Sequence, residues 1–340
     1  MGRLMISLTS RLKNSNYTFV FRRNRVSLSK LKAEKKYLKL FFEILTRILD
    51  NYIFSFRLFF IKDSKVLLIH PQTIGFNLFF RLKNHNKIFY YVMDNSFFCV
   101  RSYNVHPLQN KECLQCLDIL KPLAECKPSP VSMSLNQNLK HLKRLKKESM
   151  SILFLSQNKN QKSLLKLHFG DSVKVRIIGM DTNEVHKKKT LNIKEFPTYD
   201  IVFHGSSLIA KGVLYFVELA INLPNYTFFI PDSKENLAKV FKSFPPNNVT
   251  CECVTWESGL LEIVQQAKLV VNPSLWSAPI EGALIKSSFF NDNVATVESK
   301  YGFENEVTFI KNHIRLSEDI SEAKNQIESF LVNHYRINKV

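Results

Sequence analysis

Short runs of apolar residues recur along the chain from residue 64, and segments with a helical spacing of apolar positions separate them. Strands buried on both faces of a parallel sheet have such continuous apolar runs, whereas helices repeat their apolar positions every three or four residues. The first half of the chain therefore predicts strands over 65–70, 87–94, 151–155 and 173–178, with helices over 71–83, 134–148 and 157–168.

A second series of the same kind follows residue 198. It predicts strands over 199–204, 226–231, 249–254 and 269–271, with helices over 210–222, 233–243 and 259–267. Alternating strands and helices are typical of α/β layers with mainly parallel sheets. We therefore expect an α/β protein with two Rossmann-like domains facing a cleft, where a ligand binds at the carboxyl ends of the strands.

The domain boundaries follow from the same pattern. We expect the first α/β domain over 63–185, with a Cys-rich insertion over 99–130, and the second over 199–316. The segment 186–198, with Lys187, Lys188, Lys189 and Pro197, is interpreted as an exposed linker. A basic helical segment over 1–62 precedes the first domain, and a C-terminal helix over 317–340 follows the second.

Five charged residues interrupt the most apolar segment of the chain, 38–61. They are Lys39, Glu43, Arg47, Asp50 and Arg57, and their spacing of 4, 4, 3 and 7 places them on one stripe of a helix. Such a helix cannot span a bilayer while exposed to lipid. Two interpretations remain open: the apolar faces pack in a protein core, or the helix lies in a membrane interface beside the basic run 22–39.

The net charge of +19 is concentrated in the first part of the chain. Residues 1–150 carry 27 Lys and Arg against 9 Asp and Glu, whereas the rest carries 21 against 20. This asymmetry indicates one surface that faces an anion, such as lipid headgroups, an anionic acceptor or nucleic acid. A general bias toward Lys without any partner is the alternative.

Several function classes are excluded by the absence of their motifs. No two of the 9 glycines are separated by a single residue, so the dinucleotide fingerprint is absent, and there is no P-loop. The sequence also lacks the H-E-x-x-H helix of zinc proteases and the G-x-S-x-G turn of hydrolases. The 6 cysteines are too few for a secreted disulfide framework, so we expect a reducing, cytoplasmic compartment.

Two loops of the second domain carry groups suited to a nucleotide. The first contains Gly205, Ser206 and Ser207, and Lys211 with Gly212 opens the next helix. A glycine turn, backbone N–H groups at a helix start and a lysine together suit a diphosphate. The second loop has Pro273 and Ser274 at a strand end, and Glu281 at a helix start can accept hydrogen bonds from ribose hydroxyls. Taken singly, Lys211 could be a solvated lysine and Glu281 a carboxylate that stabilises the helix dipole.

At these residues the sequence resembles the family 4 glycosyltransferases of the GT-B fold, over 199–310 and more loosely over 64–183. Those enzymes use a nucleotide sugar and retain the anomeric configuration. The resemblance implies that Gly205, Lys211 and Gly212 bind the donor diphosphate, and that Pro273, Ser274 and Glu281 bind sugar and ribose. Ser277 stands nearest the place of the family's first motif acid.

The resemblance also indicates residues around the donor. Trp276 either contacts the donor sugar or packs in the core. Asp94 ends a strand where relatives have a His-Asp pair beside the acceptor, and Met93 replaces the histidine. We therefore consider Asp94 and Glu281 as catalytic candidates and His70, at another strand end, as a weaker one. No D-x-D motif is present, so no divalent metal is required for the chemistry.

Four cysteines of the irregular stretch have a spacing compatible with zinc. Cys99, Cys113, Cys116 and Cys126 form C-x13-C-x2-C-x9-C. A C-x2-C turn allows two thiolates to share a tetrahedral zinc ion, and two further cysteines complete a structural site. Four buried or free thiols are the alternative interpretation.

The sequence thus predicts a cytoplasmic glycosyltransferase of the hexosyltransferase type, peripheral at the inner face of a membrane. Its partners would be a nucleotide-sugar donor, an anionic membrane surface and a glycan or lipid-linked acceptor of polysaccharide or lipopolysaccharide biosynthesis. The alternative is a catalytically degenerate GT-B protein that binds nucleic acid or a partner protein, although nucleic acid is not the expected partner.

Overall fold

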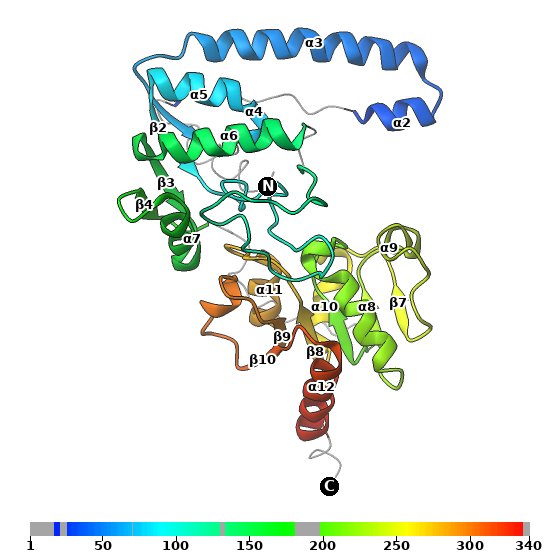
Figure 1. The fold of residues 1–340 in the computed structure, drawn as a ribbon. Coiled ribbons are helices and arrows are strands. Elements are labelled where there is room, and N and C mark those ends of the chain that lie inside the picture. Colours follow the sequence, from blue (N-terminus) through cyan, green and yellow to red (C-terminus); the bar gives the residue numbers. More distant parts are fainter. Residues whose placement is uncertain (1–16, 21–25, 70, 130–132, 181–197, 336–340) are drawn as a thin grey trace. The chain divides into compact units, whose positions relative to one another are not determined.

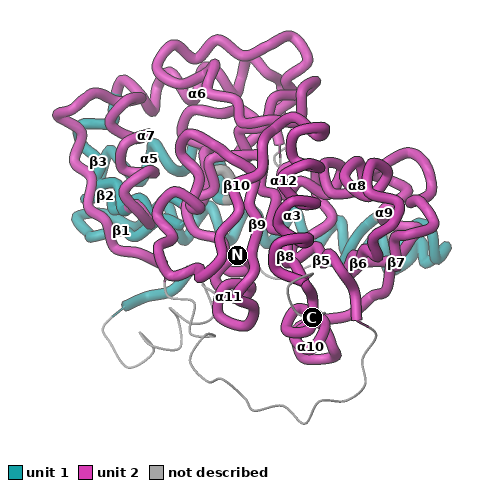
Figure 2. The backbone as a smooth tube through the Cα atoms, turned by 90° about the horizontal axis from the view of Figure 1, so that it is seen from below, with its two compact units in different colours: residues 1–92, 148–155 teal, residues 93–147, 156–340 magenta. Residues whose placement is uncertain are grey.

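A computed structural model of the chain describes residues 17–20, 26–69, 71–129, 133–180 and 198–335. The expected linker 186–198 lies outside these residues except for Thr198, as do parts of the segment 1–62 and the last residues of 317–340. The chain divides into two compact units, residues 1–92 with 148–155 and residues 93–147 with 156–340 (Figure 2). The Cys-rich stretch thus belongs to the second unit, together with the second strand series.

The first unit contains a short parallel sheet with helices packed on it. Its elements are α2 (Leu28–Ala33), α3 (Tyr37–Phe59), β1 (Lys65–Leu68), α4 (Pro71–Ile74), α5 (Phe76–His85), β2 (Lys87–Tyr91) and β3 (Ile152–Ser156), the last of which ends at the unit boundary. Strands β1 and β2 pair in parallel, as do β2 and β3. With β4 (Lys174–Ile177) they form a four-stranded sheet of order β1-β2-β3-β4.

A glycine divides the helix expected over 71–83. Gly75 has a φ of 92°, a left-handed value that ends α4 and starts α5 one residue later. The buried side of α5 then packs on the sheet, and the rings of Phe79 and Tyr90 lie 6.2 Å apart. In α3, by contrast, only Phe54 and Leu58 are buried, so core packing explains little of that helix.

The second unit is built around a six-stranded sheet. Before it come α6 (Leu135–Glu148), α7 (Lys159–Phe169) and β4 (Lys174–Ile177). The sheet consists of β5 (Ile201–Phe203), β6 (Phe228–Ile230), β7 (Val249–Cys251), β8 (Leu269–Asn272), β9 (Asn293–Val297) and β10 (Asn312–Leu316). The helices around it are α8 (Val213–Asn222), α9 (Lys234–Phe241), α10 (Leu260–Gln266), α11 (Gly282–Phe290) and α12 (Ile320–Tyr335), visible in Figure 1.

The order of this sheet is β10-β9-β8-β5-β6-β7, and all neighbouring strands in it pair in parallel. The chain lays down β6 and β7 on one side of β5 and then returns to place β8, β9 and β10 on the other. The strand order therefore reverses between β5 and β8, and ligands of open parallel sheets bind at the carboxyl ends of strands at such a point. The predicted α/β class is confirmed.

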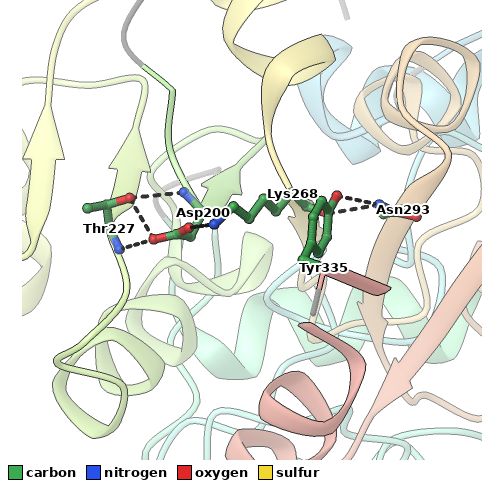
Figure 3. Close-up of polar contacts among 5 residues, drawn as sticks. All are labelled: Asp200, Thr227, Lys268, Asn293 and Tyr335. Atoms are coloured by element: carbon green, nitrogen blue, oxygen red, sulfur yellow. Dashed lines mark hydrogen bonds and ion pairs between the residues drawn. The ribbon is translucent and has the colours of Figure 1, made fainter. Parts of the chain in front are cut away.

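The amino ends of the same strands are joined by polar contacts (Figure 3). Lys268, before β8, forms an ion pair of 2.6 Å with Asp200, before β5. Asp200 also accepts hydrogen bonds from the N–H and hydroxyl of Thr227, before β6. Tyr335 of α12 and Asn293 of β9 complete the cluster, because both donate to the Lys268 carbonyl. The amino ends of these strands are thus linked by polar contacts, and the carboxyl ends are left for a ligand.

Candidate functional site

A pocket of about 250 Å³ lies at the carboxyl ends of β5 and β8, entirely within the second unit. Its walls come from the two loops that the sequence singled out and from the start of α11. The lining residues are His204, Gly205, Ser206, Lys211, Asn272, Ser274, Ile280, Glu281, Gly282 and Ala283. The reversal of strand order and the two loops therefore coincide in space.

Gly212 holds the two loops against each other. Its φ of 74° is left-handed, and a Cβ atom there would overlap the Pro273 carbonyl. Only glycine has neither the Cβ nor the strain of that backbone. The short helical turn Ile209–Lys211 precedes Gly212, and the Leu275 N–H donates to the Ala210 carbonyl at 3.0 Å. The expected helix over 210–222 consequently begins only at Val213, which leaves Lys211 at the pocket.

Lys211 and Glu281 meet inside the pocket. The Lys211 ammonium pairs with Glu281 Oε1, and the Ser274 hydroxyl donates to the same oxygen. The Glu281 side chain is 6% exposed and that of Lys211 24%. Glu281 occupies the N-cap position of α11 without capping it, so its carboxylate is directed to Lys211 and Ser274 rather than to the helix N–H groups. Both are therefore pocket groups and not solvated surface charges.

Two further pocket residues, His204 and Asn272, were not predicted as site residues. Burial, with a smaller contribution from Lys286, lowers the pKa of His204 to about 3, so its imidazole is neutral. The ring bonds the Ser287 hydroxyl at 2.8 Å and stacks on Trp256 at 5.2 Å between centroids. Asn272 donates to the His204 carbonyl at 2.6 Å. Their place in the sequence could have indicated them, because each residue ends or follows a strand directly before one of the two predicted loops.

Two buried polar atoms at or beside the site have no hydrogen-bond partner among the described residues. They are the amide oxygen Oδ1 of Asn272 and the indole Nε1 of Trp276. Buried polar groups in proteins are nearly always hydrogen-bonded, and an exception calls for an explanation such as a ligand. Trp276 is 4% exposed and lies under the Lys211 ammonium, 5.1 Å from its ring centroid. It is thus both a core residue and a neighbour of the charged pair.

Ser206 and Ser207 point to different partners. Ser206 lines the pocket. Ser207 is not among the lining residues, and its side chain hydrogen-bonds the carboxylate of Asp232, which contributes to lowering the pKa of Asp232. The structure therefore brings Ser206 to the candidate site together with Gly205, whereas Ser207 binds Asp232 in the loop after β6.

Ser277 is buried and bound by the Cys-rich stretch. Its hydroxyl donates to Glu112, and its N–H donates to the side-chain oxygen of Asn104 at 3.1 Å. Asn95 donates to its carbonyl at 2.9 Å, and Glu112 also accepts from the Lys300 N–H at 2.7 Å. Where the resemblance expects an acid, this chain thus has a serine that anchors the loop after β8 to a neighbouring carboxylate.

Asp94 lies within electrostatic range of the pocket. It is 6% exposed and accepts a hydrogen bond from the Ser96 N–H at 3.0 Å. Burial raises the pKa of Tyr103, and the charges of Asp94 and Glu281 both add to this effect. The Tyr103 ring contacts Trp276 edge to face, with centroids 4.6 Å apart. The charges of both catalytic candidates therefore act on Tyr103. His70 lies outside the described residues.

Glu304 is a second buried carboxylate that the sequence did not reveal. It is 4% exposed, and the hydroxyl and N–H of Ser299 both donate to its Oε1. Burial raises the pKa of Glu304 to about 7, and the charges of Glu281 and Glu112 contribute. The acidic groups around the pocket thus repel one another, which a bound cation or the uptake of one proton by Glu304 would relieve.

The four cysteines of the predicted zinc site lie close enough for their charges to interact. Burial raises the pKa of Cys116 to about 12, and Cys113 and Cys126 contribute; burial also raises the pKa values of Cys99 and Cys126. All are free thiols. Among the described residues, no three His, Cys, Asp or Glu side chains are grouped as ligands for a metal ion. A structural zinc at these cysteines stays a prediction.

Comparison with known proteins supports the fold. No family model and no curated protein matches the chain. Among solved structures, it is similar to a GtfA/B complex (TM-score 0.50, 12% identity) and to sucrose-phosphate synthase from Thermosynechococcus elongatus (0.51, 12%). It is also similar to HepE from Anabaena in complex with UDP and glucose (0.51, 13%). These alignments cover 84%, 79% and 79% of this chain.

The chain spans only 54%, 64% and 69% of the length of those three proteins. At these identities the likeness concerns the arrangement of strands and helices and not the chemistry. The proteins are glycosyltransferases built from two Rossmann-like domains. With its two parallel sheets and flanking helices, the chain has the α/β GT-B fold of those glycosyltransferases.

Proposed function

We propose that this chain is a glycosyltransferase that binds a nucleotide-sugar donor in the pocket of its second unit. The observation that carries the proposal is the Lys211–Glu281 pair, with Ser274, at the reversal point of the sheet and the start of α11. A cation beside a helix start binds a diphosphate, and a buried carboxylate accepts hydrogen bonds from the hydroxyls of a ribose. The likeness to a structure that holds UDP and glucose supports the same donor class.

The donor would exchange one set of polar contacts for another. Without a ligand, Lys211 compensates the buried Glu281 carboxylate. A diphosphate would take the Lys211 ammonium, and the ribose hydroxyls would then donate to Glu281 in its place. The Glu281 carboxylate accepts hydrogen bonds at either stage, while the positive charge of Lys211 moves from Glu281 to the diphosphate.

Charge develops on the diphosphate as the glycosidic bond breaks. A fixed ammonium and the N–H groups at the α11 start stabilise that charge without reorganisation during the reaction. We assign this role to Lys211, so that no divalent metal is needed, and we assign the acceptor side of the chemistry to Asp94. Transfer proceeds with retention of anomeric configuration to a glycan or lipid-linked acceptor of polysaccharide or lipopolysaccharide biosynthesis, with a hexose as the transferred sugar.

The donor site is tested by Lys211→Ala. Because charge-assisted contacts contribute about 1.5–3 kcal/mol, the affinity for UDP measured by titration calorimetry should fall by about 10- to 100-fold. Lys268→Ala is the matched control, since Lys268 pairs with a carboxylate at the opposite end of the same strands. Its UDP affinity should equal that of the wild type. Equal affinities for the wild type and Lys211→Ala would reject the site.

Turnover distinguishes an enzyme from a binding module. The purified chain incubated with UDP-glucose, UDP-galactose and UDP-N-acetylglucosamine should release UDP from at least one donor, and Asp94→Asn should slow this release without weakening UDP binding. A chain that binds UDP but never releases it from any donor, in the presence or absence of a glycolipid acceptor, is the catalytically degenerate protein of the alternative interpretation.

A further inference from the structure

The exposed side of α3 is apolar over the whole helix. Leu38 and Tyr52 expose 78% and 73% of their surface, and Phe42, Leu49 and Phe56 expose between 62% and 64%. With roughly 100° of rotation per residue, these five positions fall on one side of the helix. We call this side, defined by these five residues, the outward face. The helix has 23 residues and is thus about 35 Å long.

The middle of the charged stripe of α3, at Glu43 and Arg47, is turned toward the rest of the first unit. By the same rotation, Glu43 and Arg47 lie on the side of the buried Phe54 and Leu58. Arg47 pairs with Glu43 at 3.0 Å and donates to the Val26 carbonyl, and both side chains are less than one third exposed. Figure 1 shows α2 and α5 on one side of α3, and both helices contact it. Glu43 and Arg47 in the middle of the stripe are therefore paired inside the unit, whereas Lys39 and Arg57 near the helix ends are exposed.

This arrangement is the reverse of an ordinary surface helix. A helix on the surface of a protein in water normally places its apolar side on the core and its charged side in solvent. In α3 the apolar side is the exposed one, and large contiguous apolar patches of this kind mark interaction sites. The outward face carries no charged side chain, and the Tyr52 hydroxyl is its one polar side-chain group.

The charge around α3 indicates what covers the outward face. Lys32, Lys35 and Lys36 are exposed at the turn between α2 and α3, and Lys62 and Lys65 follow its end. Residues 1–150 carry 27 Lys and Arg against 9 Asp and Glu. A second copy of the chain would bring the same positive charge against itself, whereas anionic lipid headgroups complement it. Aromatic side chains such as Tyr52 and Phe56 are common in the headgroup region.

We propose that α3 lies in the plane of an anionic lipid bilayer, with its outward face inserted at the boundary between headgroups and acyl chains. The described helices include none that is long and apolar enough to cross a membrane, and α3 would anchor the chain from one side only. Apolar insertion and the surrounding lysines then act together, which a stable peripheral anchor requires. This inference does not depend on the pocket or on the proposed donor.

Flotation with vesicles tests the anchor on the full-length chain. The wild type should float with vesicles of phosphatidylcholine and phosphatidylglycerol at 7:3, and bind at least 10-fold more weakly to phosphatidylcholine alone. Salt at 0.5 M should weaken binding without abolishing it, because screening acts on the charges and not on the inserted side chains. A wild type that stays unbound at low salt overturns the proposal.

A pair of charge-matched variants separates insertion from electrostatics. Leu49→Glu with Tyr52→Glu places two carboxylates on the outward face and should reduce binding to the 7:3 vesicles at least 10-fold. Ile221→Glu with Phe244→Glu changes the net charge equally at residues that are 51% and 76% exposed in the second unit, and should bind as the wild type does. Equal binding of the two double variants would refute insertion.

Two further readouts keep the result interpretable. The melting temperature and UDP affinity of Leu49→Glu with Tyr52→Glu should equal those of the wild type, since the replaced side chains are exposed and lie outside the pocket. A chain that fails to bind UDP would therefore not contradict the membrane proposal, and a chain that fails to bind vesicles would not contradict the donor site. If the wild type dimerises without lipid and this variant does not, a second copy covers the outward face and the membrane proposal is wrong.

Discussion

The pocket of the second unit and the outward face of α3 differ in which groups are exposed: the pocket contains charged side chains, and the outward face exposes apolar ones. In the pocket, Lys211 and Glu281 are drawn inside and paired, while the apolar side chains of β5 and β8 fill the core beneath them. On α3, the Glu43–Arg47 pair is turned to the unit, and the apolar side chains remain outside. A buried ion pair can bind a small polar ligand that replaces one member of the pair. An exposed apolar face is suited to a large apolar surface such as the acyl region of a bilayer.

The two regions also differ in how closely their geometry is determined. The pocket depends on single atoms, such as the Pro273 carbonyl against Gly212 and the Ser274 hydroxyl on Glu281. The outward face depends on the summed apolar surface of five exposed side chains and not on the position of any single atom. Substitutions in the pocket should therefore have large local effects, and substitutions on the outward face should leave stability almost unchanged.

The largest effect is expected from Gly212→Ala. The left-handed backbone contributes about 1–2 kcal/mol of strain and the displacement of Pro273 about 1–3 kcal/mol, so the free energy of unfolding should fall by about 4 kcal/mol. Gly282→Ala is the control, because a Cβ atom there meets nothing within 4 Å. Chemical denaturation compares the two variants. Equal stability would mean that the two loops are not held together at Gly212.

Glu304 gives the pocket region a pH dependence. Its pKa is about 7 in the folded chain, against an ordinary value of 4.5, so the folded state holds this proton more tightly than the unfolded state. This stabilisation is fully present below pH 4.5 and is lost as the pH rises through 7. Its size is about 3 kcal/mol, at 1.36 kcal/mol per pKa unit.

Glu304→Gln measures this contribution. The amide oxygen still accepts from Ser299 but cannot ionise. Relative to the wild type, the variant should gain about 3 kcal/mol of unfolding free energy between pH 4.5 and pH 8 in urea denaturation. Leu49→Ala, which removes no titratable group, should show the wild-type pH profile. A constant difference between Glu304→Gln and wild type across this range would show that Glu304 ionises freely.

The smallest effects should come from α3 itself, and they divide by side. Leu58→Ala removes a buried side chain and should cost about 2 kcal/mol, whereas Leu49→Ala on the outward face should stay within about 0.5 kcal/mol. Thermal unfolding of the two variants without lipid provides the measurement. A cost of 2 kcal/mol or more for Leu49→Ala would mean that the outward face packs against protein in solution, which would contradict a lipid partner.

Much of the fold could be predicted because it depends on local periodicity. The strands expected around 87–94, 151–155 and 269–271 are present as β2, β3 and β8, with ends shifted by a few residues. Errors occurred where one backbone angle decided the outcome. Gly75 divides one expected helix, and Gly212 shifts the start of another to a later residue. The sequence alone does not show which glycines adopt a positive φ.

The candidate site was predicted in part for a related reason. Lys211, Ser274 and Glu281 follow strands or open helices, and parallel strands place their carboxyl ends together, so their convergence follows from the order of elements. Glu112 lies far from these residues in the sequence, and nothing in its local pattern indicates that Ser277 and Lys300 would donate to it. Glu304 is bound by the nearby Ser299, but its burial could not be read from the sequence.

The sequence by itself determined the α/β succession, the basic surplus of residues 1–150 and the two loops of the pocket, because each follows from residue types and their spacing along the chain. Only the tertiary structure decided which side of α3 faces the protein, since helical spacing defines a stripe but not its direction. It also decided that Glu281 is paired with Lys211 and that Ser277 is bound to Glu112. Burial and pairing depend on neighbours distant in the chain, and these are established only when the chain has folded.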